Sequence, residues 1–379
     1  MKTILFTDRL GAHSIWSLLD SIAEELIKKG NKVIYCRFDD GLQGSPRVVP
    51  NGVILYDIKV PQKKRPWDLF KQHREFSKAL SSVLQNYSVD VIHTNFAIPS
   101  ISARIVASKC SVPYIVSTQH ELYQSMSLHL RIGLRLTQHL VDHIFYISNE
   151  VKKSFTSKIF TDTDKSSIIY NGIDIDNLRE NIPKNFFRLP LINKEQEIHI
   201  VCVGRMVPVK GQRILLEVLP EILKQYPNCR VTLIGSGPDE ENLQQLAKSL
   251  DITKHVTFTG WIERSLAMSI ISTSDLMVIP SSQEGFGLVL AEAMALEVPV
   301  VCSDIPVFRE VIGSKSAINN ALFEVMNVAD LAEKVLNLLA DEMLKQQLVK
   351  DGFDRVVNTF TQEKMVESYL NIYSKLDKK

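Results

Sequence analysis

Short β-rich runs alternate with longer amphipathic stretches along most of the chain, and this alternation limits the fold more than any other feature of the sequence. In the first half, runs rich in Val, Ile, Tyr and Thr predict strands at residues 3–7, 32–36, 53–56, 89–94, 113–117 and 143–147. Residues 13–29 carry apolar side chains at helical spacing and end before Gly30. Strands that alternate with such helices favour a parallel α/β sheet.

The alternation lapses between residues 171 and 197, where Asn, Pro and charged residues cluster as they do in a connector. It restarts with further predicted strands at residues 198–203, 230–234, 255–259, 275–279 and 298–302. A chain of 379 residues is also too long for one hydrophobic core. We therefore predict two α/β domains, with residues 1–182 in the first and residues 183–360 in the second.

Composition argues against several classes of protein. The chain is 45% hydrophobic and 23% charged with a formal net charge of +1, so an extended nucleic-acid-binding surface is not expected. Its five cysteines lack the spacing of a zinc site or a disulfide framework. Asp8 and Arg9 interrupt the first apolar run, which predicts a strand and not a signal peptide, and no run approaches the length of a membrane span. We expect a cytoplasmic protein.

A glycine-rich turn in the second predicted domain is the first candidate site. Gly285 and Gly287 stand between an apolar run and residues 288–296, which are rich in helix formers. Such a turn presents unpaired N–H groups and the positive end of the helix dipole, so it can bind phosphate. Glu284 and Glu292 flank it, and carboxylates bind hydroxyl groups. The combination suggests a nucleotide sugar; the alternative is an ordinary turn with solvent-facing glutamates.

Two cations follow another glycine, Gly204, at the end of the strand predicted at residues 198–203. The guanidinium of Arg205 can bind two phosphate oxygens, and Lys210 adds a compact charge at the start of the next predicted helix. Cations placed here would stabilise the charge that develops on a departing nucleotide diphosphate. The alternative is a basic pair on the protein surface.

In the first predicted domain, the loops after the strands are where a parallel sheet binds ligands. The first of these loops contains one glycine, Gly11, and therefore lacks the G-x-G-x-x-G fingerprint of dinucleotide-binding proteins; a plain turn is the alternative for it. His13 stands in the same loop, His93 lies at a strand end, and His120 follows the strand predicted at residues 113–117. An isolated histidine is often structural, and that alternative stays open for His120.

Five motifs, in the expected order, resemble the retaining glycosyltransferases of family 4, which have the GT-B fold. Glu284-Gly-Phe-Gly and a second glutamate after seven intervening residues, Glu292, are similar to the family's E-x7-E signature. The segment from Gly204 to Gly211 is similar to its G-R-x-x-x-x-K-G motif. Three lesser landmarks match at residues 171–174, 235–238 and 260–261.

The resemblance implies two Rossmann-like domains that face each other across a cleft, with the acceptor bound by the first and the nucleotide sugar by the second. It also implies that a C-terminal helix, at residues 361–379, packs back on the first domain. The predicted catalytic residues are His120, Arg205, Lys210 and Glu284. The predicted donor-binding residues are Gly204, Arg205, Lys210, Ile262, Glu284, Gly285, Phe286, Gly287, Leu288 and Glu292. The predicted acceptor-side residues are Gly11, His13 and His93.

Individual roles in the donor site also come from the resemblance. Glu292 would hold the ribose diol, while Glu284 and the backbone of Phe286 and Gly287 would hold the sugar hydroxyls. Ile262 would lie near the base. His120 would face the donor sugar.

By resemblance, the protein moves a sugar from a nucleotide diphosphate sugar, most commonly a UDP-sugar, to a glycan or lipid-linked acceptor in bacterial surface polysaccharide assembly, lipopolysaccharide included. Family members retain the anomeric configuration without an enzymic nucleophile, because the departing phosphate accepts the acceptor's proton. Two other functions stay open: an epimerase or phosphorylase on the same fold, and a non-catalytic sugar-binding subunit.

We expect no metal and no other cofactor. Two D-x-D triplets, at residues 162–164 and 174–176, could hold a divalent cation on a diphosphate, but both lie in connector-like sequence. Arg205, Lys210 and a helix N-terminus already supply positive charge to the predicted site.

Basic residues cluster around a helix predicted at residues 67–87, most of whose apolar face we expect in the core. The cluster consists of Lys63, Lys64, Arg65, Lys71, Arg74 and Lys78, beside Trp67. Each basic residue near an anionic bilayer is worth about 1 kcal/mol. Because many relatives act on lipid-linked acceptors, we predict peripheral docking on an anionic membrane; the alternative is a solvated basic face with no partner.

Overall fold

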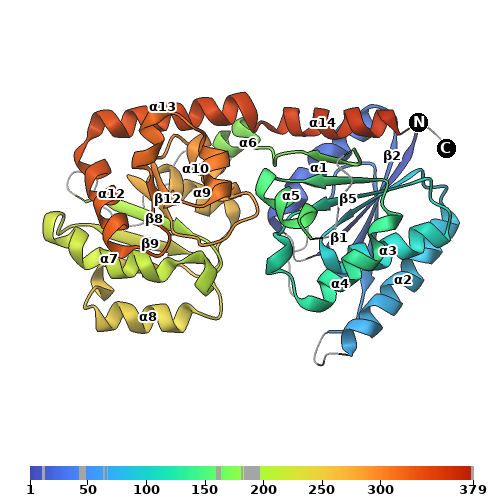
Figure 1. The fold of residues 1–379 in the computed structure, drawn as a ribbon, viewed down its shortest axis with the longest axis horizontal. Helices are drawn as coiled ribbons and strands as arrows, with labels where there is room; N and C mark the ends of the chain where they lie inside the picture. The colour runs from blue at the N-terminus through green and yellow to red at the C-terminus, as the bar shows by residue number, and fades with distance from the viewer. Residues whose placement is uncertain are drawn as a thin grey trace. The chain divides into compact units, whose positions relative to one another are not determined.

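The computed structural model describes residues 1–10, 13–41, 48–62, 65, 67–158, 164–180, 182 and 197–376, without the side chains of residues 13–16 and 316. The chain forms two compact units, Met1–Gly172 with Gln362–Lys379, and Ile173–Thr361 (Figure 1). Each unit has a parallel sheet, which confirms the predicted pair of α/β domains. The cleft between them stays a prediction.

The sheet of the first unit has the order β3-β2-β1-β4-β5-β6-β7. Its strands are β1 (Thr3–Arg9), β2 (Lys32–Asp39), β3 (Val53–Lys59), β4 (Val91–Asn95), β5 (Tyr114–Gln119), β6 (His143–Tyr146) and β7 (Ser166–Ile168). All but β7, which is short and begins with two serines, lie where the sequence predicts them. The chain reverses direction across the sheet between β1 and β4, so the loops after these two strands flank the switch point where α/β sheets bind ligands.

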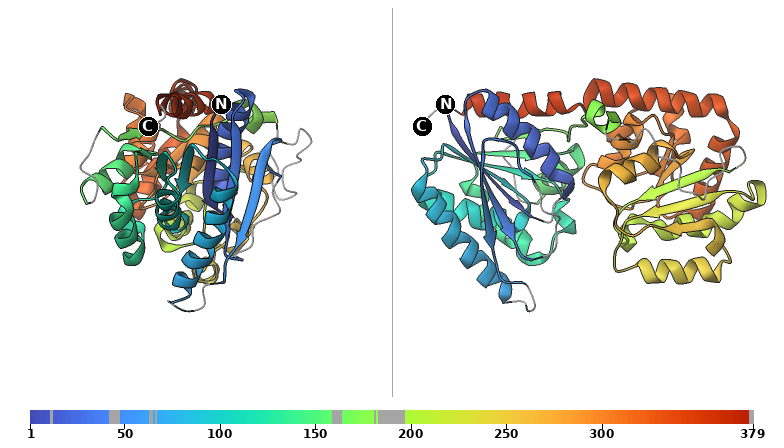
Figure 2. Two further views of the ribbon diagram at one scale, coloured as in Figure 1. Left: turned by 90° about the vertical axis from the view of Figure 1, so that its right-hand side faces the viewer. Right: turned by 180° about the vertical axis from the view of Figure 1, so that it is seen from behind.

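Helices cover both faces of this sheet. They are α1 (His13–Lys28), α2 (Asp68–Asn86), α3 (Ala97–Lys109), α4 (Leu128–Thr137), α5 (Asn149–Thr156) and α14 (Gln362–Lys375), with short 3-10 turns η1 (Tyr123–Ser125) and η2 (Gln138–Leu140). Helices α1 and α14 lie alongside each other and share one core with the strands (Figure 2). Helix α3 packs on the strands between α2 and α4.

A buried chain of hydrogen bonds attaches α14 to the first sheet. Nδ1 of His93 lies 2.5 Å from the Tyr373 hydroxyl, and Nε2 lies 2.7 Å from the Thr118 hydroxyl. The Thr118 hydroxyl in turn lies 3.2 Å from that of Tyr369, and all four side chains are buried. The prediction that His93 lies on the acceptor side is therefore wrong, because its ring has no exposed surface and both nitrogens are bonded within the core.

The sheet of the second unit has the order β10-β9-β8-β11-β12-β13. Its strands are β8 (His199–Val203), β9 (Arg230–Ile234), β10 (Val256–Phe258), β11 (Leu276–Ile279), β12 (Val300–Ser303) and β13 (Leu322–Phe323). The two-residue β13 is not predicted from sequence, because it is too short to show a pattern. Here the switch point lies between β8 and β11.

The helices of the second unit are α6 (Ile175–Glu180), α7 (Gln212–Gln225), α8 (Glu240–Ser249), α9 (Arg264–Ser272), α10 (Leu288–Ala295), α11 (Pro306–Ile312), α12 (Val328–Ala340) and α13 (Glu342–Thr359), with 3-10 turns η3 (Pro208–Lys210), η4 (Thr253–His255) and η5 (Ser316–Asn320). The unit begins at residue 173 and not at the predicted 183, because Arg179 of α6 donates to the Glu297 carboxylate and the Ala295 carbonyl. None of the helices in the described ranges is both long and apolar enough to cross a bilayer.

The buried His93 predicts how stability depends on pH. Burial, aided by the neighbouring His120 ring, lowers the pKa of His93 to about 3, against about 6.5 in an unfolded chain. Between these values the unfolded chain binds a proton that the folded chain does not, so the stability present above about pH 6.5 is lost as the pH falls. A His93→Gln variant cannot titrate there. From about pH 7.5 to about pH 5.5, wild-type unfolding free energy should fall about 1.4 kcal/mol more than that of the variant.

Thermal and denaturant unfolding of both proteins at the two pH values measure this difference. Parallel losses of stability in the two proteins would contradict the assignment of His93 as a buried neutral group.

Candidate active site

The loops after β8 and β11 meet at the switch point of the second sheet. The backbone N–H of Ser282 donates to the Val209 carbonyl at 2.8 Å. Gly211 adopts a φ of 69°, and a Cβ atom there would lie 2.1 Å from the Pro280 carbonyl oxygen. Only glycine fits this contact, so the two segments singled out in the sequence are brought together by backbone packing.

Side chains of these two loops form an ion pair. The Lys210 ammonium binds the Glu284 carboxylate, and the Ser281 hydroxyl donates to the same Glu284 oxygen at 3.0 Å. Both charged side chains are partly exposed. A cation and a carboxylate held side by side offer one group to an anion and one to hydroxyl donors, as a sugar diphosphate requires.

Helix α10 begins directly after this pair. Gly287 precedes it with a φ of 86°, no side chain caps the helix, and a Cβ atom at Gly287 would lie 2.7 Å from the Phe308 ring. The first N–H groups of the helix, including that of Leu288, have no carbonyl partner within the helix. The Phe286 side chain is buried against Phe360, with ring centroids 5.4 Å apart, and the role of its backbone in holding the sugar stays a prediction.

Glu292, in the second turn of α10, is buried and paired. The residue is 4% exposed, which excludes the solvent-facing alternative, and the Arg264 guanidinium donates to its Oε1 at 2.5 Å. Burial raises the pKa of the Glu292 carboxyl, and Arg264 opposes this shift. Arg264 is absent from the predicted set. Its position at the start of α9, where a cation opposes the helix dipole, is a signal that could have drawn attention to it.

The remaining predicted donor residues lie in loops of the same unit. Arg205 is exposed and has no ion pair within the described residues. Gly204 directly follows β8, and Ile262 is half-buried two positions before Arg264. The role of each stays a prediction.

In the first unit, His120 directly follows β5. Its Nε2 atom lies 3.0 Å from Oδ1 of Asn95, and its ring stacks on Phe96 with centroids 5.1 Å apart and planes 29° apart. Burial lowers the pKa of His120 to about 3, so the ring is neutral near pH 7. Gly11 lies outside the described residues, and so does the side chain of His13, although its backbone begins α1. Their acceptor-side roles stay predictions.

The described residues contain no cluster of three or more His, Cys, Asp and Glu side chains that could hold a metal ion. Of the two D-x-D triplets, Asp162 lies outside the described residues, and Asp174 and Asp176 lie at the start of α6. The expectation that no metal is needed stays a prediction.

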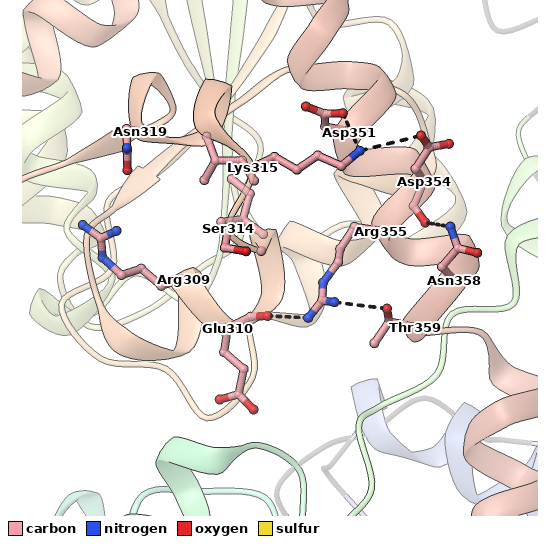
Figure 3. Close-up of a pocket in the computed structure, with 13 residues that line it drawn as sticks. Arg309, Glu310, Ser314, Lys315, Asn319, Asp351, Asp354, Arg355, Asn358 and Thr359 are labelled. Carbon is pink, nitrogen blue, oxygen red and sulfur yellow. Dashed lines mark hydrogen bonds and ion pairs between the residues drawn. The ribbon is translucent and has the colours of Figure 1, made fainter.

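A cavity of about 760 Å³ lies elsewhere in the second unit, between α11, η5 and α13 (Figure 3). Several of its charged groups have partners: the Lys315 ammonium lies 2.6 Å from Asp351 and 3.9 Å from Asp354, and Arg355 donates to the Glu310 carbonyl and the Thr359 hydroxyl. None of the residues that line it belongs to the predicted site. Its volume is therefore no evidence for the donor site.

Two parallel α/β units of this topology define a GT-B glycosyltransferase fold. Residues 17–177 match the family model described as Glycosyltransferase Family 4, and residues 184–355 match the one described as Glycosyl transferases group 1. The chain belongs to glycosyltransferase family 4 and is a glycosyltransferase.

Relatives and structures similar to the chain agree with this family. An uncharacterised glycosyltransferase of Methanocaldococcus jannaschii is 26% identical over 364 residues, which cover 93% of this chain and 92% of that protein. N-acetyl-alpha-D-glucosaminyl L-malate synthase of Bacillus anthracis is 24% identical over 372 residues, covering 93% and 91%. The crystal structure of HepE from Anabaena in complex with UDP and glucose has a TM-score of 0.81 at 18% identity, covering 99% of this chain and 100% of that one.

The Glu292 pair predicts the effect of two substitutions on UDP binding. If Glu292 binds the ribose diol of UDP as predicted, Glu292→Ala removes two charge-assisted hydrogen bonds and should weaken UDP binding by about 30- to 1000-fold, or roughly 2–4 kcal/mol. Arg264→Ala should weaken UDP binding by a smaller factor of about 10, because the Glu292 carboxylate remains and loses only its ion pair with Arg264. Calorimetry with UDP measures both effects.

Arg213→Ala is the matched control, because this arginine forms an exposed pair with Glu217 on α7. If Glu292→Ala bound UDP as tightly as the control, the carboxylate would have only a structural role.

Proposed function

We propose that the protein is a retaining glycosyltransferase that moves a sugar from a UDP-sugar to a glycan or lipid-linked acceptor. We place its activity in the cytoplasm, in the assembly of bacterial surface polysaccharide. The observation that carries the proposal is the meeting of the loops after β8 and β11, which joins Lys210 to Glu284 beside the uncapped N-terminus of α10.

This arrangement suits a nucleotide diphosphate sugar. In the proposed complex, Arg205, Lys210 and the N–H groups of Gly287 and Leu288 bind the diphosphate, which carries the negative charge. Glu292 is buried at one side of the helix start, where it accepts hydrogen bonds from the ribose diol. Glu284 accepts hydrogen bonds from the sugar. HepE binds UDP and glucose on the same fold, which supports UDP as the donor's nucleotide.

The proposed transfer needs no enzymic nucleophile. The bond between the anomeric carbon and the phosphate oxygen breaks, and its electron pair goes to the diphosphate, where Arg205 and Lys210 stabilise it. The acceptor oxygen bonds to the anomeric carbon on the same face, and its proton goes to the departing phosphate. His120 is neutral, so we assign it a hydrogen bond to the donor sugar and not a positive charge. An epimerase or a sugar-binding subunit would not transfer the sugar to an acceptor.

Donor turnover tests this proposal. Thermal shift with UDP-, GDP- and ADP-sugars first identifies the donor, because a tightly bound ligand raises the melting temperature. Slow UDP release from the chosen UDP-sugar should then persist in EDTA, because side-chain cations and a helix N-terminus replace a metal. Binding without release would favour the sugar-binding subunit, and activity that EDTA abolishes and manganese restores would contradict metal independence.

We also propose that the first unit docks on an anionic membrane surface. Trp67, just before α2, and Phe70, within α2, are 57% and 74% exposed. We expected most of the apolar face of this helix in the core, and Phe76 and Leu80 do lie there, whereas Phe70 does not. Arg65, Lys71, Arg74 and Lys78 are exposed around them. Lys63 and Lys64 lie outside the described residues.

Helix α4 adds a second apolar surface to the same layer of helices. Leu128, Ile132 and Leu136 recur every fourth residue and are 65%, 50% and 67% exposed. The neighbouring Arg135 is also exposed. Since α3 packs against both α2 and α4, these two helices belong to one layer, and we call their exposed side chains the docking face. Apolar side chains among cations complement the interface of an anionic bilayer.

Flotation with vesicles that contain anionic lipid tests the docking face. The wild type should float at low salt, and the Phe70→Ser, Leu136→Ser double variant should stay in the soluble fraction. Met343→Ser is the control, because Met343 is an exposed apolar residue of the second unit. Failure of the wild type to bind at low salt would favour a soluble acceptor.

A further inference from the structure

The backbone of Phe96 adopts a conformation that side chains rarely tolerate. Its φ of 57° and ψ of 149° lie close to a region used almost only by glycine, so the conformation is strained. The residue joins β4 to α3 at the switch point of the first sheet and gives α3 no side-chain cap. Such a conformation persists only where the surrounding structure fixes it, and it often marks a functional position.

The Phe96 ring lies against His120. The two ring centroids are 5.1 Å apart and their planes differ by 29°, which is a stacked arrangement. The unusual backbone conformation therefore places an aromatic face on one side of the imidazole. Stacking of this kind favours one orientation of the imidazole ring.

Asn95 determines which nitrogen of His120 carries the proton. Nδ2 of Asn95 donates to the Thr7 carbonyl at 3.4 Å, so the amide oxygen faces Nε2 of His120 at 3.0 Å. An amide oxygen can only accept, and Nε2 must therefore donate its proton. Asn95 is fully buried, which leaves it no competing water.

The other nitrogen of His120 is then a bare acceptor. In a neutral imidazole with a proton on Nε2, Nδ1 carries a lone pair. Nδ1 is buried and has no hydrogen-bond partner within the described residues, which is energetically unfavourable for a polar atom. A hydroxyl group that donates to Nδ1 recovers this energy, whereas a phosphate oxygen is repelled by the lone pair.

We propose that Asn95 and Phe96 are positioning residues for sugar transfer: Asn95 fixes the tautomer of His120, and Phe96 holds its ring, so that Nδ1 accepts a hydrogen bond from a sugar hydroxyl. This inference rests on the proposed function in one respect, namely that His120 contacts the donor sugar. It adds a specificity element, since the site selects a hydroxyl donor and rejects an anion at this position.

Nitrogen-15 NMR of protein labelled at histidine tests the tautomer without any assay of activity. The His120 spectrum of the wild type should show a protonated Nε2 and an unprotonated Nδ1. In Asn95→Leu, which has no acceptor for Nε2–H, the spectrum should show a mixture of tautomers. A wild-type spectrum with the proton on Nδ1 would overturn the inference, and so would an unchanged spectrum in the variant.

Kinetics test whether the tautomer matters for turnover. Asn95→Leu should lower kcat by about 10- to 100-fold, the range seen when the partner that orients a functional histidine is lost, and leave the Kd for UDP within about twofold. Phe96→Gly removes the ring together with the backbone strain, so it should lower kcat without lowering Tm. If Phe96 had only a structural role, Phe96→Gly would keep the wild-type kcat.

Asn95→Asp separates positioning from packing. A carboxylate still accepts from Nε2–H but favours the charged imidazolium, so it should raise the pKa of His120 and add an acidic limb to the pH profile of kcat. Asn31→Ala is the control, because Asn31 also makes two hydrogen bonds to the backbone of the first unit. The control should lose stability with no change in the shape of that profile.

Turnover of the His120→Ala variant distinguishes the proposed role of His120 from the positioning role of Asn95 and Phe96. If His120→Ala retained wild-type turnover, the assignment of His120 to the donor sugar would be wrong. If His120→Ala lost turnover while Asn95→Leu and Phe96→Gly kept it, the proposed function would stand and the positioning role of Asn95 and Phe96 would be overturned.

Discussion

The close contact between Gly211 and the Pro280 carbonyl is the constraint on which the candidate site depends. It lets the loops after β8 and β11 approach at the switch point, and a side chain on Gly211 would push them apart. Lys210 and Glu284 stand 74 positions apart in the chain and bind each other because of this approach. The sheet order alone selects these two loops, since β8 and β11 are the neighbours at which the chain reverses.

Much of the fold follows from periodicity. Buried parallel strands read as continuous apolar runs, so all strands except β7 and β13 are predicted close to their observed limits. The glycines of the site are also visible in the sequence, because a turn after a strand and before a helix has few other solutions. The burial of Glu292 shows that the E-x7-E pattern marks more than an exposed helix surface.

What the sequence does not predict depends on contacts between distant residues. His93 resembles a ligand-binding histidine at a strand end until α14 covers it with Tyr373, more than two hundred residues away. Arg264 becomes relevant only when the fold brings it to Glu292. Glu297 is a further case: it adopts a φ of 58° after α10, a conformation that favours glycine, and Arg179 binds its carboxylate.

Hydrogen exchange of the backbone amides with and without UDP tests the central claim that the turn before α10 is the nucleotide site. We predict that UDP slows exchange at residues 285–289 and at the loop from Gly204 to Gly211, because the amides of the first turn become hydrogen-bonded to phosphate and the loops close on it. Protection confined to the cavity between α11 and α13, or the absence of protection at residues 285–289 under saturating UDP, would contradict this account.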